Sequence, residues 1–548
     1  LDLLADEDRL AVQAASVLGQ RFRLDAVLQL LGKNEYRPDA LLNQRLLQPE
    51  GEDYLFVHVL LRDAIYDSLL ASHRRALHLR AAAWYRQRDA ALHARHLDFG
   101  GSEDAADAYL QAALLAVRMA DFEQALSLAS RGAEIAQSAQ LGTQLNCLQG
   151  DLLIQAGAIS SAIHAFAAAA DSASDDQIRC RALIGRATGL TVQDKLDQAL
   201  ETLDHAAPLA EMSQNTALLT ELHYRRGDIL FALARTDECL HAHQQAETLA
   251  RESASPLLEI RAQAGMADAC YAKGLIMTAR GYFERCLELA RAEQRLPQEV
   301  GNLSMYGLTH LYTGSVAEAL ATLQEAGKLA AEYGNLRAEM TAYMNLGLVL
   351  LFTEDIDSAE RYGHFGLKLA QQLRASRFYG DNLAQIGEAK VLKGEIQEGL
   401  HYLERAYRAA LDSVPTHIAP YILGVLARVT RNEKQRQDAI REGQRYLDQG
   451  SLSHNYLHFY QNMIEVYLHK AEPERMLYYA DALAEYTRDE PLTWSDFYIE
   501  RGRLLSSHLR GECDQMSQQA ENLLDVAARA GIHTGTQELK AVIAPGIK

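Results

Sequence analysis

The stretch Arg337–Leu373, RAEMTAYMNLGLVLLFTEDIDSAERYGHFGLKLAQQL, carries the main structural signal of the chain. Apolar residues in its first half, such as Leu346, Val349 and Leu350, are three and four positions apart, which is the spacing of one face of a helix. The segment TEDID then interrupts the pattern and supplies side chains that cap helices. Helical spacing resumes in SAERYGHFGLKLA, so the stretch predicts two helices joined by a short turn.

The same arrangement recurs along the chain, marked by small residues twelve positions apart. Two packed helices approach closely only where the side chains at their crossing are small. The pairs are Ala113/Ala125, Gly150/Ala162, Ala187/Ala199, Gly227/Cys239, Ala267/Ala279, Gly307/Ala319, Gly347/Ala359, Gly387/Gly399 and Ala427/Ala439, with Ile464/Met476 as a weak continuation. A third small residue follows seven positions later in the first eight pairs, and Tyr446 replaces it in the ninth.

The step between pairs is 40 residues from Ala199 to Ala439 and 37 before that. An alanine-rich helical protein produces single pairs by chance, but a constant step with a third position in register favours a repeat. The pattern resembles the tetratricopeptide repeat (TPR) family, in a variant longer than its usual ~34 residues. We therefore predict an all-α, right-handed TPR-type superhelical solenoid over residues 104–487, with a degenerate repeat and C-terminal cap over 488–548.

The first hundred residues do not fit the repeat. DEDRLAVQAASVLG, RLDAVLQLLG and RPDALLNQRLL read as three helices, and LLQPEGEDYLFVH reads as a β-hairpin whose second strand is Tyr54–Val57. Three helices followed by a two-stranded wing predict a winged-helix domain over residues 1–72, followed by linker helices over 73–103.

Two segments of this region resemble bacterial signal-transduction ATPases with numerous domains (STAND). They are AASVLGQRF at residues 14–22 and LFVHVLLRDAIYDSLLASHRRALHLRAAAWY at residues 55–85. The family includes large LuxR-type transcriptional activators and the ATPase halves of class III adenylate/guanylate cyclases. The resemblance implies a nucleotide-binding domain upstream that uses ATP and ADP. This chain has no GxxxxGK[ST] motif and begins at Leu1 without an initiator Met, so we expect it to be part of a longer protein with no cofactor of its own.

His58 is the one residue to which the resemblance gives a nucleotide-related role. Val57-His58-Val59 is similar to the MHD-type segment of STAND proteins, whose His contacts the ADP phosphate, although Val59 stands where the family has Asp. An imidazole N–H is able to donate to a phosphate oxygen. The alternative is that His58 packs against, or caps, the helix that follows the wing. Nucleotide contact is expected only in the full-length protein.

Composition and motifs limit the kinds of partner and site that we expect for this chain. The net charge of −19 repels phosphate backbones, which makes nucleic acid an unfavourable partner. No apolar run is long enough to span a membrane, and six scattered cysteines without a CxxC motif indicate a reducing cytoplasm. His93 and His96 lack further ligands at metal-binding spacing, and no catalytic motif is present. We therefore predict a chain without a metal or catalytic site.

A ligand is expected on the concave surface, which the first helix of each repeat lines in this fold family. The candidate residues flank the small position of those helices: Tyr224, Asp228, Phe231, Asp268, Tyr271, Tyr312, Asn345, Phe352 and Glu388. Aromatic and acidic side chains together suit a protein, a peptide or a small cationic inducer. The alternative for each residue is ordinary packing between helices.

The predicted function is a non-catalytic sensor arm that controls an upstream ATPase domain, and the full-length protein is expected to be an ATPase or a nucleotide cyclase. Ligand binding is expected to promote formation of homo-oligomers. The alternative is a stand-alone TPR adaptor that scaffolds a protein complex without nucleotide.

Overall fold

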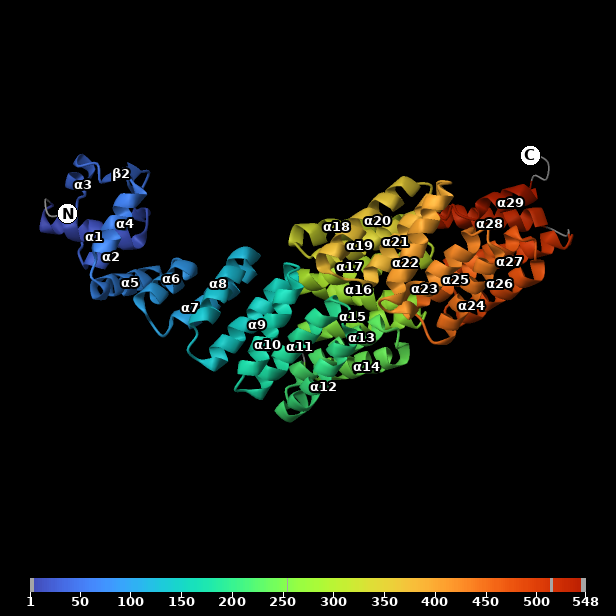
Figure 1. Cartoon of the computed structure of the whole chain (residues 1–548), viewed down its shortest axis with the longest axis horizontal. Helices are drawn as coiled ribbons and strands as arrows, with labels where there is room; N and C mark the ends of the chain where they lie inside the picture. Colours follow the sequence, from blue (N-terminus) through green and yellow to red (C-terminus); the bar gives the residue numbers. More distant parts are fainter. Residues whose placement is uncertain (1–3, 254, 513–515, 544–548) are drawn as a thin grey trace. The chain divides into compact units, whose positions relative to one another are not determined.

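The computed structural model describes residues 4–253, 255–512 and 516–543, which form helices and one small sheet (Figure 1). The chain divides into two compact units. The first comprises residues 1–152 and 165–178, and the second comprises residues 153–164 and 179–548. These limits differ from the domain boundaries expected from the sequence, which stay a prediction.

The first unit begins with a small α/β region. Its elements are α1 (Asp6–Leu18), β1 (Arg21–Arg23), α2 (Leu24–Leu31), α3 (Asp39–Asn43), β2 (Leu47–Glu50) and β3 (Asp53–Phe56). The antiparallel sheet has the order β1-β3-β2, and Leu47 pairs with Phe56 in the hairpin. The hairpin agrees with the sequence analysis, whereas β1 was not expected and α3 is shorter than its segment. Val12, Leu30 and Phe56 are buried at its core.

Helices complete the first unit. They are α4 (Val59–Ser68), α5 (Ala71–Tyr85), α6 (Ala90–Gly100), α7 (Ala105–Arg118) and α8 (Phe122–Ile135), with parts of α9 (Ala139–Gln155) and α10 (Ile159–Ser172). The helix α9 ends, and α10 begins, in the second unit.

Paired helices follow one another through the second unit (Figure 1). They are α11 (Asp176–Val192), α12 (Leu196–Ser213), α13 (Thr216–Ala232), α14 (Thr236–Ser253), α15 (Pro256–Ala272), α16 (Ile276–Ala292), α17 (Leu296–Tyr312), α18 (Val316–Tyr333), α19 (Leu336–Leu350), α20 (Ile356–Leu373), α21 (Arg377–Leu392), α22 (Ile396–Leu411), α23 (Pro415–Val429), α24 (Glu433–Asp448), α25 (Ser453–His469), α26 (Pro473–Tyr486), α27 (Thr493–Leu509), α28 (Met516–Ala530) and α29 (Thr536–Ile543).

The small residues lie where the two helices of a pair touch. A Cβ added to Gly307 would lie 2.9 Å from Leu323 Cγ, and one added to Gly387 would lie 2.8 Å from Leu403 Cγ, in each case sixteen residues later on the partner helix. Ala319 is completely buried as well. The repeat frame read from the sequence is therefore the frame in which the helices pack.

Most turns within the pairs contain a residue in the left-handed conformation seven positions after the small residue. Glycine occupies it at Gly274, Gly314 and Gly394, where positive φ carries no steric cost. Asp194 occupies it in the α11–α12 turn with φ 56°, a conformation that aspartate tolerates better than most residues. Asp194 thereby places a carboxylate where those three repeats have glycine.

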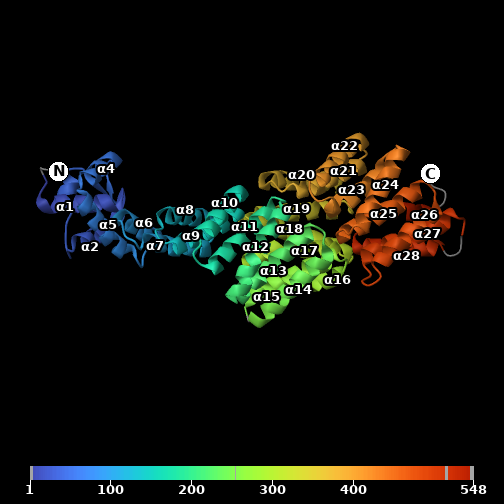
Figure 2. The same cartoon turned by 60° about the horizontal axis from the view of Figure 1, so that its bottom comes forward.

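Loops from late repeats contact the turns of repeats five pairs earlier. Figure 2 shows the helix pairs of the second unit from a second side. Glu490, in the loop between α26 and α27, accepts hydrogen bonds from the backbone N–H of Met277 at 2.8 Å and of Thr278 at 3.2 Å, at the start of α16. Asp194 accepts from Ser376 Oγ at 3.1 Å and from the Arg377 N–H at the start of α21. These contacts bring the inner helices of distant repeats together.

A pair of glycine substitutions tests the repeat frame. Gly387→Ala should lower the free energy of unfolding by about 1–3 kcal/mol, because the new methyl group overpacks the crossing of α21 and α22. Gly301→Ala, in α17, should raise it by about 0.5–1 kcal/mol, because no atom lies near its Cβ position and alanine favours helix. Urea titration measures both. Equal effects at the two sites would contradict close packing at Gly387.

Candidate ligand-binding site

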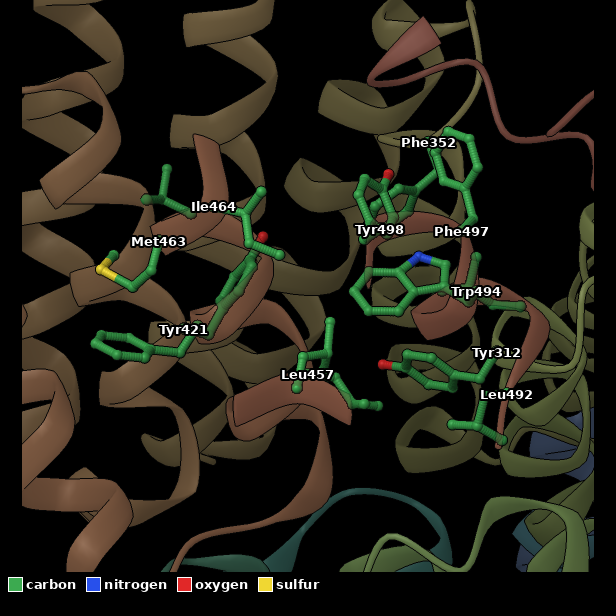
Figure 3. Packing of buried hydrophobic residues seen from close by; sticks show 14 of the residues in the cluster. Tyr312, Phe352, Tyr421, Leu457, Met463, Ile464, Leu492, Trp494, Phe497 and Tyr498 are labelled. Carbon is green, nitrogen blue, oxygen red and sulfur yellow. The ribbon is translucent and has the colours of Figure 1, made fainter. Parts of the chain in front are cut away.

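Two of the predicted groove residues belong to an aromatic cluster (Figure 3). Tyr312 of α17 and Phe352, just after α19, each lie 5.8 Å from the ring of Trp494 in α27, measured between ring centroids. The Tyr312 hydroxyl is hydrogen-bonded to His458 Nε2 of α25 at 3.0 Å. Their side chains therefore pack against the C-terminal helices of the same unit, and an open groove is not present at these two positions.

Three further candidates are also buried. Asn345 Nδ2 donates to Ser304 Oγ at 3.0 Å. Glu388 accepts from Arg428 Nη2 at 2.6 Å and from the Tyr421 hydroxyl, which neutralises its charge locally. Tyr271 is buried within hydrogen-bonding range of His454. The expected exposure on a concave surface does not hold for these residues, because Asn345 contacts α17, Glu388 contacts α23 and Tyr271 lies beside α25. Their role in binding stays a prediction.

The four remaining candidates, Tyr224, Asp228, Phe231 and Asp268, are only partly buried. Two of them are acidic and adjoin a set of charged side chains from several inner helices. We call this set the inner polar cluster: Asp194, Glu221, Arg225, Asp228, Arg261, Asp268, Arg337, Arg377, Asp381 and His417.

Solvent reaches the cluster from the side of α13 and α15. Glu221 binds Arg225 Nε at 2.9 Å and also pairs with Arg261, while Arg225 Nη1 lies 3.3 Å from Asp228 Oδ2. The side chains of Arg225 and Asp228 are 27% and 24% exposed, whereas that of Arg377 is 4% exposed. The cluster thus runs from a solvent-accessible end at α13 to a buried end at α21 and α23.

Several polar atoms at the buried end have no hydrogen-bond partner among the described residues. They are Asp194 Oδ1, Arg337 Nη1, Arg377 Nε and Nη1, Asp381 Oδ2 and His417 Nδ1. Arg377 Nε lies 3.6 Å from Asp194 Oδ1, and His417 Nε2 lies 3.9 Å from Asp381 Oδ1, both too long for good hydrogen bonds. Leaving a buried polar atom unpaired costs about 1–3 kcal/mol, so such a concentration marks a site that an external group is able to complete.

Burial also changes the charges in the cluster. It raises the pKa of Asp228 to about 6 and that of Asp381 to about 7, and it raises the pKa of Asp268 well above its usual range. Burial and the neighbouring Arg377 lower the pKa of Arg337 to about 10, which leaves the guanidinium protonated at neutral pH. Near neutral pH the carboxyls therefore carry less negative charge than their number implies.

The arginines of this cluster were not identified in the sequence, although a signal was present. Glu221 and Arg261 are 40 residues apart, as are Asp228 and Asp268, and Arg337, Arg377 and His417 follow the same step. Residues one repeat apart on the inner helices face the same way, so charges recurring at that interval indicate a shared site. The predicted site contained only aromatic, acidic and amide side chains, although arginines recur at the same interval.

In the first unit, the His58 side chain is exposed and makes no capping hydrogen bond, while its carbonyl accepts from the N–H of Leu61 at 3.1 Å. Three large apolar residues close to it in sequence are exposed: Val59 is 52%, Leu60 is 81% and Leu70 is 76% exposed. The alternative that His58 packs or caps with its side chain is therefore not what the structure shows. Nucleotide contact by His58 stays a prediction.

Other candidate sites are weaker. His93 Nδ1 is hydrogen-bonded to the Ala82 carbonyl, whereas His96 is paired with His78 at 2.9 Å, so the two histidines do not share a site. Among the described residues, no group of three or more His, Cys, Asp or Glu side chains is arranged to hold a metal ion. The helices that the structure describes include none that combines the length and apolar character needed to cross a bilayer.

Structural comparisons place the fold beside several solved proteins. Neither protein-family models nor curated proteins gave a match to the sequence. The anaphase-promoting-complex hetero-tetramer Cut9–Hcn1 has a TM-score of 0.51 at 11% identity and covers 98% of this chain and 99% of its own. A STAND protein with a TPR sensor from Pyrococcus horikoshii has a TM-score of 0.48 at 15% identity over 75% of this chain.

This chain spans 65% of the length of that STAND protein. A Rap protein complexed with competence and sporulation factor has a TM-score of 0.47 at 13% identity, covering 68% of this chain and 99% of that one. The consecutive helix pairs and the likeness to Cut9–Hcn1 over nearly the whole chain identify the fold as a TPR-type solenoid.

The buried histidines make stability depend on pH. Burial lowers the pKa of His458 to about 3, against about 6.5 in an unfolded chain, so the unfolded state binds more protons between these values. The contribution of His458 is complete above pH 6.5 and is lost as the pH falls towards 3. Compared with the parent, His458→Phe should remove about 1.4 kcal/mol per pH unit from the slope of unfolding free energy between pH 6 and 4.

Urea titrations at several pH values measure this slope, and exposed His164 replaced by Phe serves as the control. Asp228 and Asp381 oppose the trend, because a carboxyl with a raised pKa gains stability as the pH falls, but they contribute equally to parent and variant. An unchanged slope in His458→Phe would show that His458 titrates normally in the folded protein.

Proposed function

We propose that this chain is the non-catalytic sensor arm of a STAND-type ATPase. In this proposal the solenoid binds a protein, a peptide or a small-molecule inducer, and the first unit relays that binding to a nucleotide-binding domain upstream. ATP and ADP act only in that domain, and ligand binding promotes assembly into a homo-oligomer. The output domain, a cyclase or a DNA-binding activator, belongs to the full-length protein.

The observation that carries the proposal is the set of unpaired polar atoms in the inner polar cluster. A purely structural solenoid would fill its inner face with apolar side chains or fully paired ions, because orphaned polar groups lower its stability. The rings around Trp494 pack against one another and Glu388 pairs with Arg428, so these parts follow that expectation apart from the unpaired Trp494 Nε1–H. The inner polar cluster, with partly exposed Tyr224 and Phe231 beside it, departs from that expectation at several charged side chains.

The relay to an upstream domain is supported by the surface of the first unit. Val59, Leu60 and Leu70 expose large apolar side chains within twelve residues, and exposed apolar surface of this kind is typical of contacts with another domain. His58 stands at the same place, at the start of α4, with its side chain directed to solvent. In the proposal these residues face the nucleotide-binding domain, and His58 donates to the phosphate of ADP.

A second function is favoured by the covered inner face. Because α25 and α27 pack against Tyr312 and Phe352, a partner protein has less inner surface to bind than in an open solenoid. A stand-alone adaptor would then use the outer faces, without nucleotide. A P-loop in the reading frame immediately upstream of Leu1 supports the sensor arm, and its absence supports the adaptor.

Replacement of His58 tests the relay in the full-length protein. His58→Ala should accelerate release of ADP and raise basal activity, because a phosphate contact that holds the resting state is lost. Release of a fluorescent ADP analogue measures the rate. The matched control is His164→Ala, since His164 is also exposed but lies on α10. If His58→Ala and His164→Ala both release ADP at the parental rate, His58 has no part in nucleotide sensing.

A further inference from the structure

Two arginines at the buried end of the inner polar cluster lack full partners. Arg337, at the start of α19, makes no ion pair within 4.0 Å among the described residues, and its Nη1 has no hydrogen-bond partner. Arg377, at the start of α21, pairs loosely with Asp194, and its Nη1 is also unpaired. A buried guanidinium without a close anion is costly, because its charge is removed from water without compensation.

The two guanidinium groups lie beside the same aromatic ring. Arg337 Cζ is 5.3 Å and Arg377 Cζ is 4.7 Å from the ring centroid of Phe378, which is itself buried. Their positive charges disfavour one another, since Arg377 contributes to the lowered pKa of Arg337. Asp194 accepts from Ser376 and from the Arg377 N–H through Oδ2, whereas its Oδ1 lies 3.6 Å from Arg377 Nε and has no hydrogen-bond partner. Among the described residues, neither guanidinium group therefore has a hydrogen bond to an acidic side chain.

We propose that Arg337 and Arg377 together hold an oxyanion of the ligand, either a carboxylate or a phosphoryl group. Guanidinium groups suit both, because their N–H groups match the geometry of two oxygen atoms. The inference deepens the proposed sensor function and rests on it. It also differs from the sequence-based expectation of a cationic ligand, which considered Asp228 and Asp268 without the arginines beside them.

The rest of the cluster fits a ligand that enters from the α13 side. Arg225 and Asp228 are partly exposed and bind one another, so they are able to exchange their contacts for a ligand near the solvent. Tyr224 and Phe231 offer aromatic surface close to this end. Asp381 and His417 adjoin the buried end, where Asp381 Oδ2 and His417 Nδ1 are further unpaired atoms. An acidic ligand of small size, or the carboxyl terminus of a peptide, has the required chemistry.

Thermal unfolding with two probes tests the proposal. Inorganic phosphate and succinate are each titrated into the chain at constant ionic strength, with chloride as the reference salt. We expect one of them to raise Tm in a saturable manner, since a ligand that binds only the folded state stabilises it. Phosphate alone indicates a phosphoryl site, and succinate alone indicates a carboxylate site. Isothermal titration calorimetry with the active probe then gives its affinity.

Arg337→Gln distinguishes a binding arginine from a structural one. Without added anion, the variant should have a Tm equal to or above that of the parent, because an unpaired buried cation is removed. The saturable shift should be lost, and affinity for the active probe should fall at least about tenfold. Arg285→Gln, which changes an exposed arginine on α16, is the matched control and should keep the full shift.

Three results would overturn the proposal: no saturable shift with either anion, an equal shift in Arg337→Gln and Arg285→Gln, or a clear fall in the anion-free Tm of Arg337→Gln. The last result would show that Arg337 is satisfied by internal partners. None of these bears on the relay through His58, which the ADP-release measurement tests separately. If His58→Ala does not change ADP release but the anion still raises Tm, the chain is a ligand-binding solenoid without nucleotide control.

Discussion

The approach of paired helices at small residues is the constraint on which the rest of the second unit depends. At Gly307 and Gly387 the neighbouring side chain of the partner helix lies where a Cβ would stand. Close crossing gives every pair a similar geometry, and a constant step of 40 residues lets the pairs stack in register. The first helices of the pairs thereby present equivalent positions to the same inner side.

Regular stacking also brings repeats that are five pairs apart into contact. After five pairs the chain returns to the earlier turns, where Glu490 caps the start of α16 and Asp194 caps the start of α21. The inner side is then shared by helices far apart in sequence. It contains an apolar part around Trp494 and a charged part around Arg337 and Arg377, so one fold provides both a packed core and a polar interior.

The contrast between these two parts is the physical basis of the functional proposal. Around Trp494 the Tyr312 hydroxyl is paired with His458, and Glu388 is paired with Arg428, although the Trp494 Nε1–H has no hydrogen-bond partner among the described residues. At the buried end of the inner polar cluster, unpaired polar atoms belong to several charged side chains of one site. Orphaned groups reduce stability, and their concentration at one place, open to solvent at its other end, is the arrangement expected of a site that is completed by a bound molecule.

The sequence by itself determined the helical pairs, their frame and the β-hairpin of the first unit, because these depend on local spacing: small residues twelve apart, apolar residues three and four apart, and turn residues between strands. Only the tertiary structure decided that Tyr312 and Phe352 are covered while Asp228 stays partly exposed, and that Arg337 and Arg377 share one ring. Those outcomes depend on contacts between repeats that are five pairs apart, and no local sequence pattern predicts which distant repeats touch.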